Sequence, residues 1–205
     1  MGRWHYRTVS AHPPVPAELR WAFPAELESG DRRNAALAVL SPVERARYDA
    51  RPSDAYLAGR MLVRTLAGEL LGVPAGAVPL SAVCPDCGGP HGRPVVDGSD
   101  LRVSLSHADG LVLAAAAWAA DVGVDVERSA AGPERLAAIG ALAGRASVRH
   151  WTRVEAVLKA DGRGLRVDPS QVLVDEGIAS LGAIRYALHD LELPAGYTGS
   201  LAVRL

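Results

Sequence analysis

An uninterrupted apolar run, Leu111–Trp118, constrains the fold of this chain more than any other segment. A membrane-spanning helix needs about 20 apolar residues, so this run is too short to be one. A run of this length predicts a strand that is buried on both faces. Two further β-rich segments, Leu101–Leu105 and Val122–Glu127, flank it closely. Three consecutive strands with tight connections predict an antiparallel meander, with Ser106–Gly110 as its first turn.

The rest of the chain predicts helices before this region and a mixture of helices and strands after it. The clearest helix is Asp54–Leu71, which Ser53 can cap and Gly72 can end. The other predicted helices are Asp31–Leu40, Pro42–Tyr48, Pro133–Ala143 and Val148–Ala160, and the other predicted strands are 1–9, Gln171–Asp175, Ala183–Leu188 and Gly199–Arg204, with a turn at His12–Pro16. This order indicates an α+β fold. The Pro- and Gly-rich stretch Val73–Asp100 predicts a boundary between an N-terminal half, 1–100, and a C-terminal half, 101–205.

Charge and length exclude some classes of function. The chain has 205 residues and a formal net charge of −1, so we expect neither wholesale electrostatic binding to nucleic acid nor binding to a membrane surface. No N-terminal stretch has the pattern of a secretory signal, and the expected location is therefore the cytoplasm. Lys159 is the only lysine in the chain.

Four charged residues in the second half have a spacing that suits a metal site. In a strand, Asp125 and Glu127 share one face while Val124 and its neighbours point into a core. In a helix, Glu155 and Lys159 share one face, four residues apart. Three carboxylates and a lysine on rigid elements could hold a divalent cation beside a phosphate. The alternative is a solvated strand edge with an ordinary helix ion pair.

Both cysteines lie in one short segment. Cys84 and Cys87 have the Cys-x-x-Cys spacing, and His91 follows. This pattern looks like part of a zinc site, but a structural zinc needs four ligands and the chain has no second cysteine pair. His107 could be the fourth ligand, although no spacing requires it. The favoured interpretation is a reduced loop shaped by proline and glycine.

Four motifs follow one another along the chain: Gly92-Arg93-Pro94, Ser104–His107, Val122–Glu127 and Trp151–Lys159. In this order they resemble the 4′-phosphopantetheinyl transferases of the surfactin-synthetase-activating type. The segment Cys84–Pro94 looks like the actinobacterial branch of that family. The resemblance spans roughly residues 41–174.

This resemblance implies a fold and an activity. The fold is a pseudo-dimer of two similar α+β halves, with the active site in the cleft between them. Such enzymes move the 4′-phosphopantetheine arm of coenzyme A onto a serine of an acyl or peptidyl carrier protein and release 3′,5′-ADP. Two halves in one chain make a monomer sufficient.

The resemblance also implies roles for residues near the reacting atoms. Asp125, Glu127 and Glu155 match the positions that hold Mg²⁺, with Mn²⁺ as an alternative ion. Lys159 matches the lysine that closes on the pyrophosphate, and His107 matches a position that contacts the phosphates. Glu155, or a metal-bound water that it orients, is the expected base for the serine nucleophile.

Other positions match contacts to coenzyme A. Ser106 falls where the family contacts the phosphates, and Arg93 matches the basic residue of a Gly-Lys-Pro motif. Arg45 and Arg47 fall where the family places cations for the 3′-phosphate.

Two departures from the family pattern motivate an alternative. Val154 replaces the first lysine of the usual Trp-x-x-Lys-Glu-x-x-x-Lys motif, and the segment 128–150 is shorter than usual. The alternative is a catalytically impaired relative that binds coenzyme A and carrier protein without efficient turnover. A third hypothesis, a zinc-bound nucleic-acid module, is weakened by the near-neutral charge.

Overall fold

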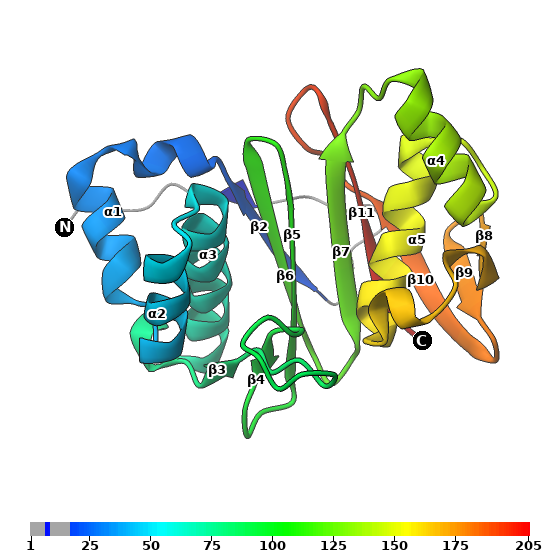
Figure 1. The fold of residues 1–205 in the computed structure, drawn as a ribbon. Helices are drawn as coiled ribbons and strands as arrows, with labels where there is room; N and C mark the ends of the chain where they lie inside the picture. The colour runs from blue at the N-terminus through cyan, green and yellow to red at the C-terminus, as the bar shows by residue number, and fades with distance from the viewer. Residues whose placement is uncertain (1–6, 9–16) are drawn as a thin grey trace.

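Two antiparallel sheets lie side by side at the centre of the molecule, and helices cover their outer faces (Figure 1). The structure is a computed structural model that describes residues 7–8 and 17–205. The first sheet has the strand order β1-β2-β6-β5, the second has the order β7-β11-β10-β9-β8, and β3 and β4 form a short hairpin. The strands are β1 Arg7–Thr8, β2 Glu18–Ala22, β3 Leu80–Ser81, β4 Val95–Val96, β5 Leu101–Ala108, β6 Leu111–Trp118, β7 Val122–Arg128, β8 Val172–Asp175, β9 Ile178–Leu181, β10 Ile184–Asp190 and β11 Tyr197–Arg204.

The helices begin and end close to the predicted residues. They are α1 Gly30–Ala38, α2 Pro42–Ala50, α3 Asp54–Leu71, α4 Pro133–Ala143 and α5 Val148–Asp161. Ser41 caps α2 in a capping box with Glu44, and Gly72 ends α3 in the left-handed conformation with φ 69°. The mixed α+β composition is thus confirmed. The predicted turn at 12–16, and the predicted opening strand apart from Arg7–Thr8, lie outside the described residues.

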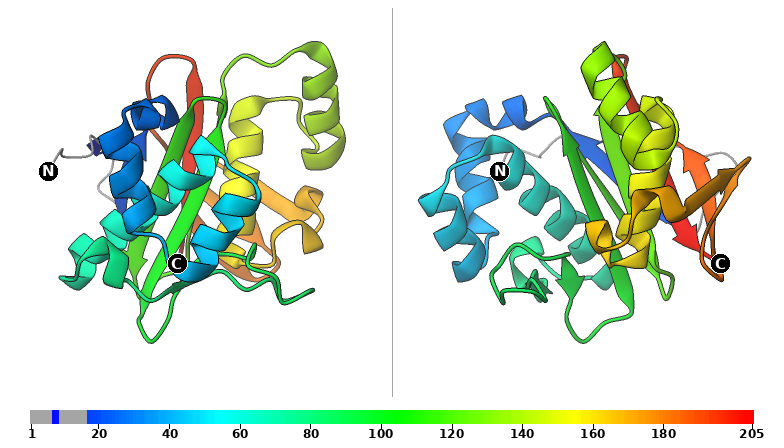
Figure 2. Two further views of the ribbon diagram at one scale, coloured as in Figure 1. Left: turned by 60° about the vertical axis from the view of Figure 1, so that its left-hand side comes forward. Right: turned by 45° about the vertical axis from the view of Figure 1, so that its right-hand side comes forward.

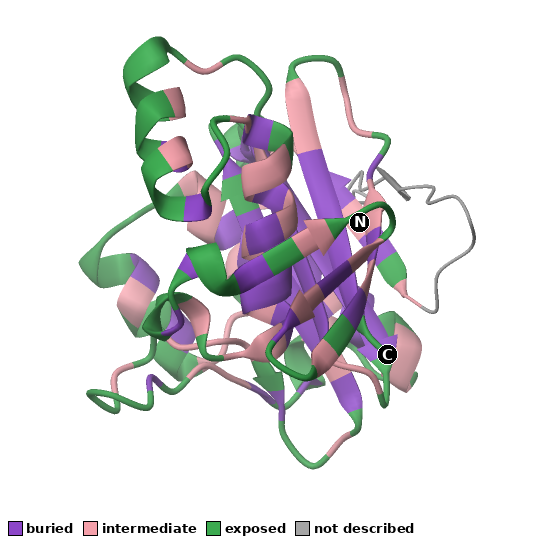
Figure 3. Ribbon diagram, turned by 90° about the vertical axis from the view of Figure 1, so that its right-hand side faces the viewer, coloured by how far each residue is buried: buried purple, intermediate pink, exposed green. Residues whose placement is uncertain are grey.

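Strand β6 is apolar along its length because both of its faces are covered. One face packs against α3 in the first core cluster, and the other face packs against the second sheet in the second core cluster. The residues on the α3 side are Val112, Ala114 and Ala116, and those on the other side are Leu111, Leu113, Ala115 and Ala117. Figure 3 shows buried residues concentrated in the strands, while α4 is largely exposed. None of the helices in residues 17–205 combines the length and hydrophobicity needed to cross a membrane.

The predicted meander is wrong at its third strand. Strand β7 does not pair with β6; it pairs with β11 in the second sheet, with Asp125 opposite Ser200. Strand β5 also continues to Ala108, so Ser106 and His107 lie on a strand and not in a turn. Hydrogen bonding to an eight-residue partner strand, β6, extends β5 beyond the apolar segment that the sequence suggested.

The division between the two sheets differs from the expected boundary at residue 100. Strands β5 and β6 follow that boundary in the sequence, yet they complete the sheet that begins with β1 and β2. The chain passes to the second sheet between Trp118 and Val122. Strand β9 was not predicted; it pairs with β8 and β10.

Two serine hydroxyls join the edges of the sheets. Ser104 Oγ accepts a hydrogen bond from the Val124 amide at 3.1 Å, and Ser106 Oγ accepts one from the Val126 amide at 3.3 Å. Both serines are buried. Side-chain oxygens therefore satisfy β7 amides where a neighbouring strand would otherwise supply carbonyls. We call this contact between β5 and β7 the seam.

Helix α5 packs very closely on β7, on the outer side of the second sheet (Figure 2). A Cβ atom at Gly123 would lie 2.0 Å from the Ala156 carbonyl oxygen and 2.4 Å from the Ala160 amide nitrogen. Only a glycine fits at this distance, because real Cβ contacts are never so short. The close approach brings the residues of α5 beside the polar face of β7.

The seam predicts a cost for losing one hydroxyl. Replacing Ser104 with alanine (S104A) leaves the buried Val124 N–H without a partner, and an unsatisfied buried donor costs about 1–3 kcal/mol. We expect the free energy of unfolding in urea to fall by this amount with an unchanged m-value. Ser29 is exposed and its side chain forms no cap hydrogen bond, so S29A is the matched control and should change stability by less than about 0.5 kcal/mol. Equal stability of the two variants would contradict the seam's role.

Candidate functional site

The predicted metal residues line one cavity between the seam and α5. The cavity has a volume of about 350 Å³. Its wall is formed by residues from β5, β7 and α5. They are Leu105, Ser106, His107, Asp125, Val126, Glu127, Trp151, Glu155 and Lys159. We call it the acidic cavity. The structure thus brings together three carboxylates that are up to 30 positions apart in the chain (155 − 125).

Asp125 is the most enclosed of the three carboxylates. It is only 5% exposed, and its Oδ1 accepts hydrogen bonds from Lys159 Nζ at 2.7 Å and Ser106 Oγ at 2.8 Å. Lys159 Nζ also donates to Ser106 Oγ at 2.8 Å. Asp125 therefore does not lie at a solvated strand edge, because the seam and α5 cover it. Its second oxygen, Oδ2, is buried and has no hydrogen-bond partner.

Burial and mutual repulsion make the other two carboxylates less acidic than usual. Burial raises the pKa of Glu155, and the negative charge of Asp125 raises it further. Burial likewise raises the pKa of Glu127, followed by Asp125, although Arg135 of α4 forms an ion pair with Glu127 at 2.6 Å. Desolvated carboxylates close to one another favour a bound cation or proton.

The donor set of the acidic cavity fits a hard divalent cation. Asp125, Glu127 and Glu155 offer carboxylate oxygens, which Mg²⁺ prefers, and Asp125 Oδ2 is an unpaired buried acceptor. Their oxygens are less tightly grouped than the ligand atoms of Cys84, Cys87 and His91, which all lie within 4.8 Å of one another. Mg²⁺ commonly uses few carboxylates and completes its shell with water and substrate phosphate, so the three side chains need not all contact the ion.

A second cavity, of about 520 Å³, is lined by several cationic side chains. It lies beside α3 and the end of α2, and we call it the basic cavity. Its charged and aromatic lining comprises Arg47, Arg51, Tyr56, Arg60, His91 and His107. Arg47 and Arg60 stack on the Tyr56 ring, at 5.0 Å and 5.4 Å from its centroid. Arg47 also donates a hydrogen bond to the Pro90 carbonyl.

Arg60 lies on α3 four residues before Arg64, and such a pair of arginines usually solvates a helix face. It is instead 6% exposed, and its Nε and Nη1 atoms have no hydrogen-bond partner, although Glu44 lies 3.8 Å from Nη1. Arg64, the other half, is also buried and forms an ion pair with Glu44 at 2.7 Å. Arg60 is therefore a buried cation at the basic cavity, with two nitrogen atoms that lack hydrogen-bond partners. Arg64 instead holds α3 against α2.

Arg45 does not take part in either cavity. It pairs with Asp49 at 2.9 Å on the exposed side of α2. On a helix, residues two apart point in different directions, so Arg47 faces the cavity and Arg45 does not. Arg51, at the end of α2, also lines the basic cavity, and only its charge distinguishes it in the sequence.

A third cavity, of about 780 Å³, lies between the loop that precedes β4 and the end of α5. We call it the largest cavity, because its volume exceeds those of the acidic and basic cavities. Arg93 lines it; its Nη1 donates to the Ala160 carbonyl at 3.4 Å, and Asp121 lies 3.8 Å from Nη2. Burial lowers the pKa of the Arg93 guanidinium from its usual value. An arginine still carries its charge there, so an anion would offset part of its desolvation.

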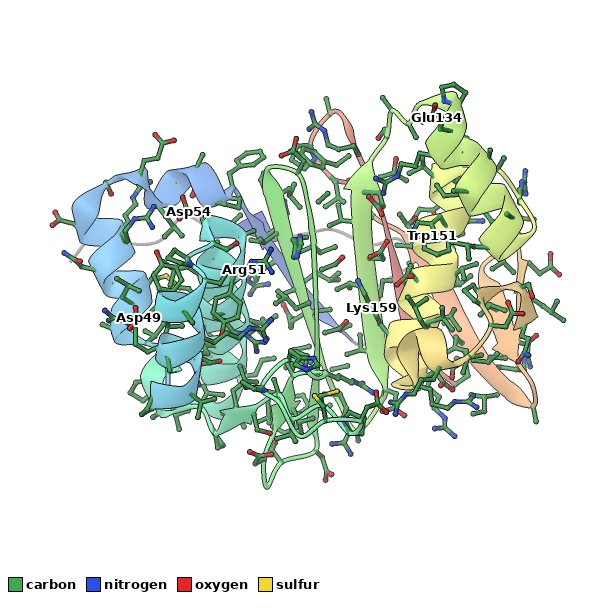
Figure 4. All side chains as sticks on the ribbon, in the orientation of Figure 1. Asp49, Arg51, Asp54, Glu134, Trp151 and Lys159 are labelled. Atoms are coloured by element: carbon green, nitrogen blue, oxygen red, sulfur yellow. The ribbon has the colours of Figure 1, made fainter. Side chains whose placement is uncertain are left out.

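The three cavities meet at one place. Leu105 lines all of them, His107 is shared by the acidic and basic cavities, and Lys159 is shared by the acidic and the largest cavities. Figure 4 shows Lys159 on α5 and Arg51 on the opposite helical layer, with the strands between them. The arrangement can therefore hold a long ligand with several negative charges and a cation at its centre.

No model of a known protein family matches the chain, and no curated protein matches it.

Removing the charge of Glu155 should stabilise the protein at neutral pH. A raised pKa means that the folded state binds the proton more tightly than the unfolded state, so stability is lost as pH rises through the folded-state pKa. We expect E155Q to melt at a higher temperature than the parent above that pH, and the difference to shrink as pH falls through it. The exposed Glu176 lies in a turn and supplies the control, E176Q, which should leave the melting temperature unchanged. A lower melting temperature for E155Q at neutral pH would contradict this account.

Proposed function

We propose that this chain is a 4′-phosphopantetheinyl transferase that converts carrier proteins from the apo to the holo form. The serine hydroxyl of an acyl or peptidyl carrier protein attacks the phosphorus that bears the pantetheine arm. A new Ser Oγ–P bond forms, the P–O bond of the pyrophosphate breaks, and 3′,5′-ADP leaves. The observation that carries this proposal is the junction of an acidic, a basic and a large cavity at Leu105.

The basic cavity supports recognition of the nucleotide end of coenzyme A. Arg47, Arg51 and Arg60 surround a space that is large enough for a phosphorylated ribose, and Tyr56 offers an aromatic face. Arginine binds phosphate oxygens through two parallel N–H donors. The unpaired Nε and Nη1 atoms of Arg60 are donors that a phosphate would satisfy.

The composition of the acidic cavity supports the proposal that the metal and the reacting pyrophosphate bind there. Asp125, Glu127 and Glu155 would hold Mg²⁺, or Mn²⁺ in its place. When bound, the ion offsets the negative charge that develops on the phosphate oxygens and on the leaving group. Lys159 Nζ already donates to Asp125 and Ser106, and its third N–H would bind a phosphate oxygen.

Two further side chains have assigned tasks in the proposal. Glu155 takes the proton of the serine nucleophile, and its raised pKa makes it a stronger base than an ordinary glutamate. His107, exposed at the junction of the acidic and basic cavities, donates a hydrogen bond to a phosphate oxygen. Arg93 contributes a cation on the wall of the largest cavity, which has the room for the pantetheine arm.

The arrangement of the halves supports the pseudo-dimer expected for this class of enzyme. Each sheet is antiparallel, and a long helix packs on its outer face: α3 on β6 and β5, and α5 on β7 and β11. The seam joins the two at β5 and β7, and the largest cavity takes its walls from both sides of it. In the proposal this is the cleft that receives coenzyme A.

The catalytically impaired alternative receives no support from the position of Val154. That side chain is fully buried in the core beneath α5, with an exposed fraction of 0%, and it lines none of the three cavities. A lysine missing from this position therefore removes no charge from the cavity walls. Helix α4, in the short segment 128–150, still supplies Arg135 to Glu127.

A mass-shift assay tests the proposed activity. The protein is incubated with an apo carrier protein, coenzyme A and Mg²⁺, and the carrier protein is weighed by mass spectrometry. We expect one phosphopantetheine arm on the carrier serine and an equal amount of 3′,5′-ADP. A carrier protein with that serine replaced by alanine is the control and should gain no mass. Absence of the arm across a panel of fatty-acid, polyketide and peptide carriers would refute the proposal.

Asp125 tests the metal site within the same reaction. The D125N variant keeps the size of the buried side chain but removes its charge, so folding is preserved better than with alanine. We expect the transfer rate to fall by roughly 10²-fold or more, as for loss of one group that stabilises transition-state charge, and half-saturation to require more Mg²⁺. Asp175 is exposed in the same sheet, and D175N should keep the parental rate. Parental turnover by D125N at limiting Mg²⁺ would exclude Asp125 as a ligand.

A further inference from the structure

The loop between β3 and β4 carries a second cluster of ligand atoms, separate from the acidic cavity. The sulfur atoms of Cys84 and Cys87 and a ring nitrogen of His91 all lie within 4.8 Å of one another. Cys87 Sγ is 3.0 Å from His91 Nε2. Among residues 17–205, no other group of three histidine, cysteine or acidic side chains converges this closely. The fold thus brings together residues that the sequence only suggested as an incomplete metal motif.

The backbone of the loop turns around the two sulfur atoms. The Cys84 amide donates to the Gly89 carbonyl and the Gly88 amide donates to the Cys84 carbonyl, both at 2.8 Å. The Gly89 amide donates to Cys87 Sγ at 3.4 Å. Amide donors around a sulfur favour the thiolate, which is the form that binds metal.

Apolar packing contributes little to holding this loop. Of residues 82–95, Cys84 alone is buried. The loop is nevertheless tightly folded: a Cβ atom at Gly92 would lie 2.2 Å from the Val83 carbonyl oxygen, and the Gly92 amide donates to the Ala82 carbonyl at 2.8 Å. An ion pair between Asp86 and Arg166 already ties this loop to the rest of the chain, at 3.2 Å. A metal that bridges Cys84, Cys87 and His91 would order the loop from within.

We propose that Cys84, Cys87 and His91 bind a structural Zn²⁺ that fixes the loop between β3 and β4. Two thiolates and an imidazole are the ligands that zinc takes in tetrahedral sites. Asp86, whose Oδ2 lies 3.9 Å from Cys84 Sγ, or a water molecule takes the fourth position.

The zinc site supports the wall of the neighbouring cavities. His91, Gly92 and Pro94 line both the largest and the basic cavity, and Arg93 lines the largest. The Pro90 carbonyl accepts the hydrogen bond from Arg47. Zinc would therefore hold Arg47 and Arg93 in place from outside the acidic cavity, without contacting a substrate.

Zinc content of the tag-free full chain, purified under reducing conditions, tests this proposal independently of any transferase activity. We expect about one zinc per chain by elemental analysis, and most of it lost in C87S and H91A. His189 is partly buried on β10 and outside the cluster, so H189A is the control and should keep its zinc. Replacement of zinc by Co²⁺ should give the thiolate-to-cobalt absorption of a tetrahedral site, absent in C87S.

Hydrogen exchange supplies a second readout of zinc binding. Cys87 and His91 are exposed, so replacing either residue leaves the core intact. Removal of zinc by a chelator should accelerate amide exchange in residues 82–94 and leave α3 unchanged. Two results would overturn the proposal: a chain that contains almost no zinc when reduced and takes up none from added Zn²⁺, or equal zinc in the parent and in C87S.

Discussion

The contact on which the rest of the structure depends is the seam between β5 and β7. Ser104 and Ser106 supply hydroxyl oxygens to the amides of Val124 and Val126, so two separate sheets meet without sharing a regular ladder. Ser106 also donates to Asp125 and accepts from Lys159. One side chain therefore belongs to both the architecture and the acidic cavity. Because these hydrogen bonds are buried, any shift between the sheets would leave polar groups unsatisfied and would also displace the cavity.

Small residues make the second half of the acidic cavity possible. Gly123 lets the backbone of α5 approach β7 at Ala156 and Ala160, and this sets the height of Glu155 and Lys159 above Asp125. A larger residue at 123 would move the whole helix outward. Gly123, which carries no chemistry of its own, thus determines how near the charged side chains come to one another.

Side chains of opposite charge line two separate but adjoining cavities. Carboxylates that repel one another line the cavity on one side of His107, and arginines, of which Arg60 is buried, line the cavity on the other. Each group alone would be costly to bury, and each is relieved by a ligand of opposite charge. A coenzyme that carries phosphates and arrives with a divalent cation relieves both at once, which is why the proposed transfer of a phosphopantetheine arm accounts for the two cavities together.

The sequence by itself determined the local elements and most of the acidic site. Caps at Ser41 and Ser53 and the glycine after α3 specify helices through hydrogen bonds to near neighbours, and alternation in β7 separates Val124 from Asp125. The tertiary structure alone decided which strand β7 pairs with, that Asp125 is buried, that Arg60 reaches the basic cavity and that Arg45 does not. The reason is physical: periodicity fixes the direction of a side chain within its own element, whereas the partner of a strand edge and the burial of a charge depend on segments far away in the chain.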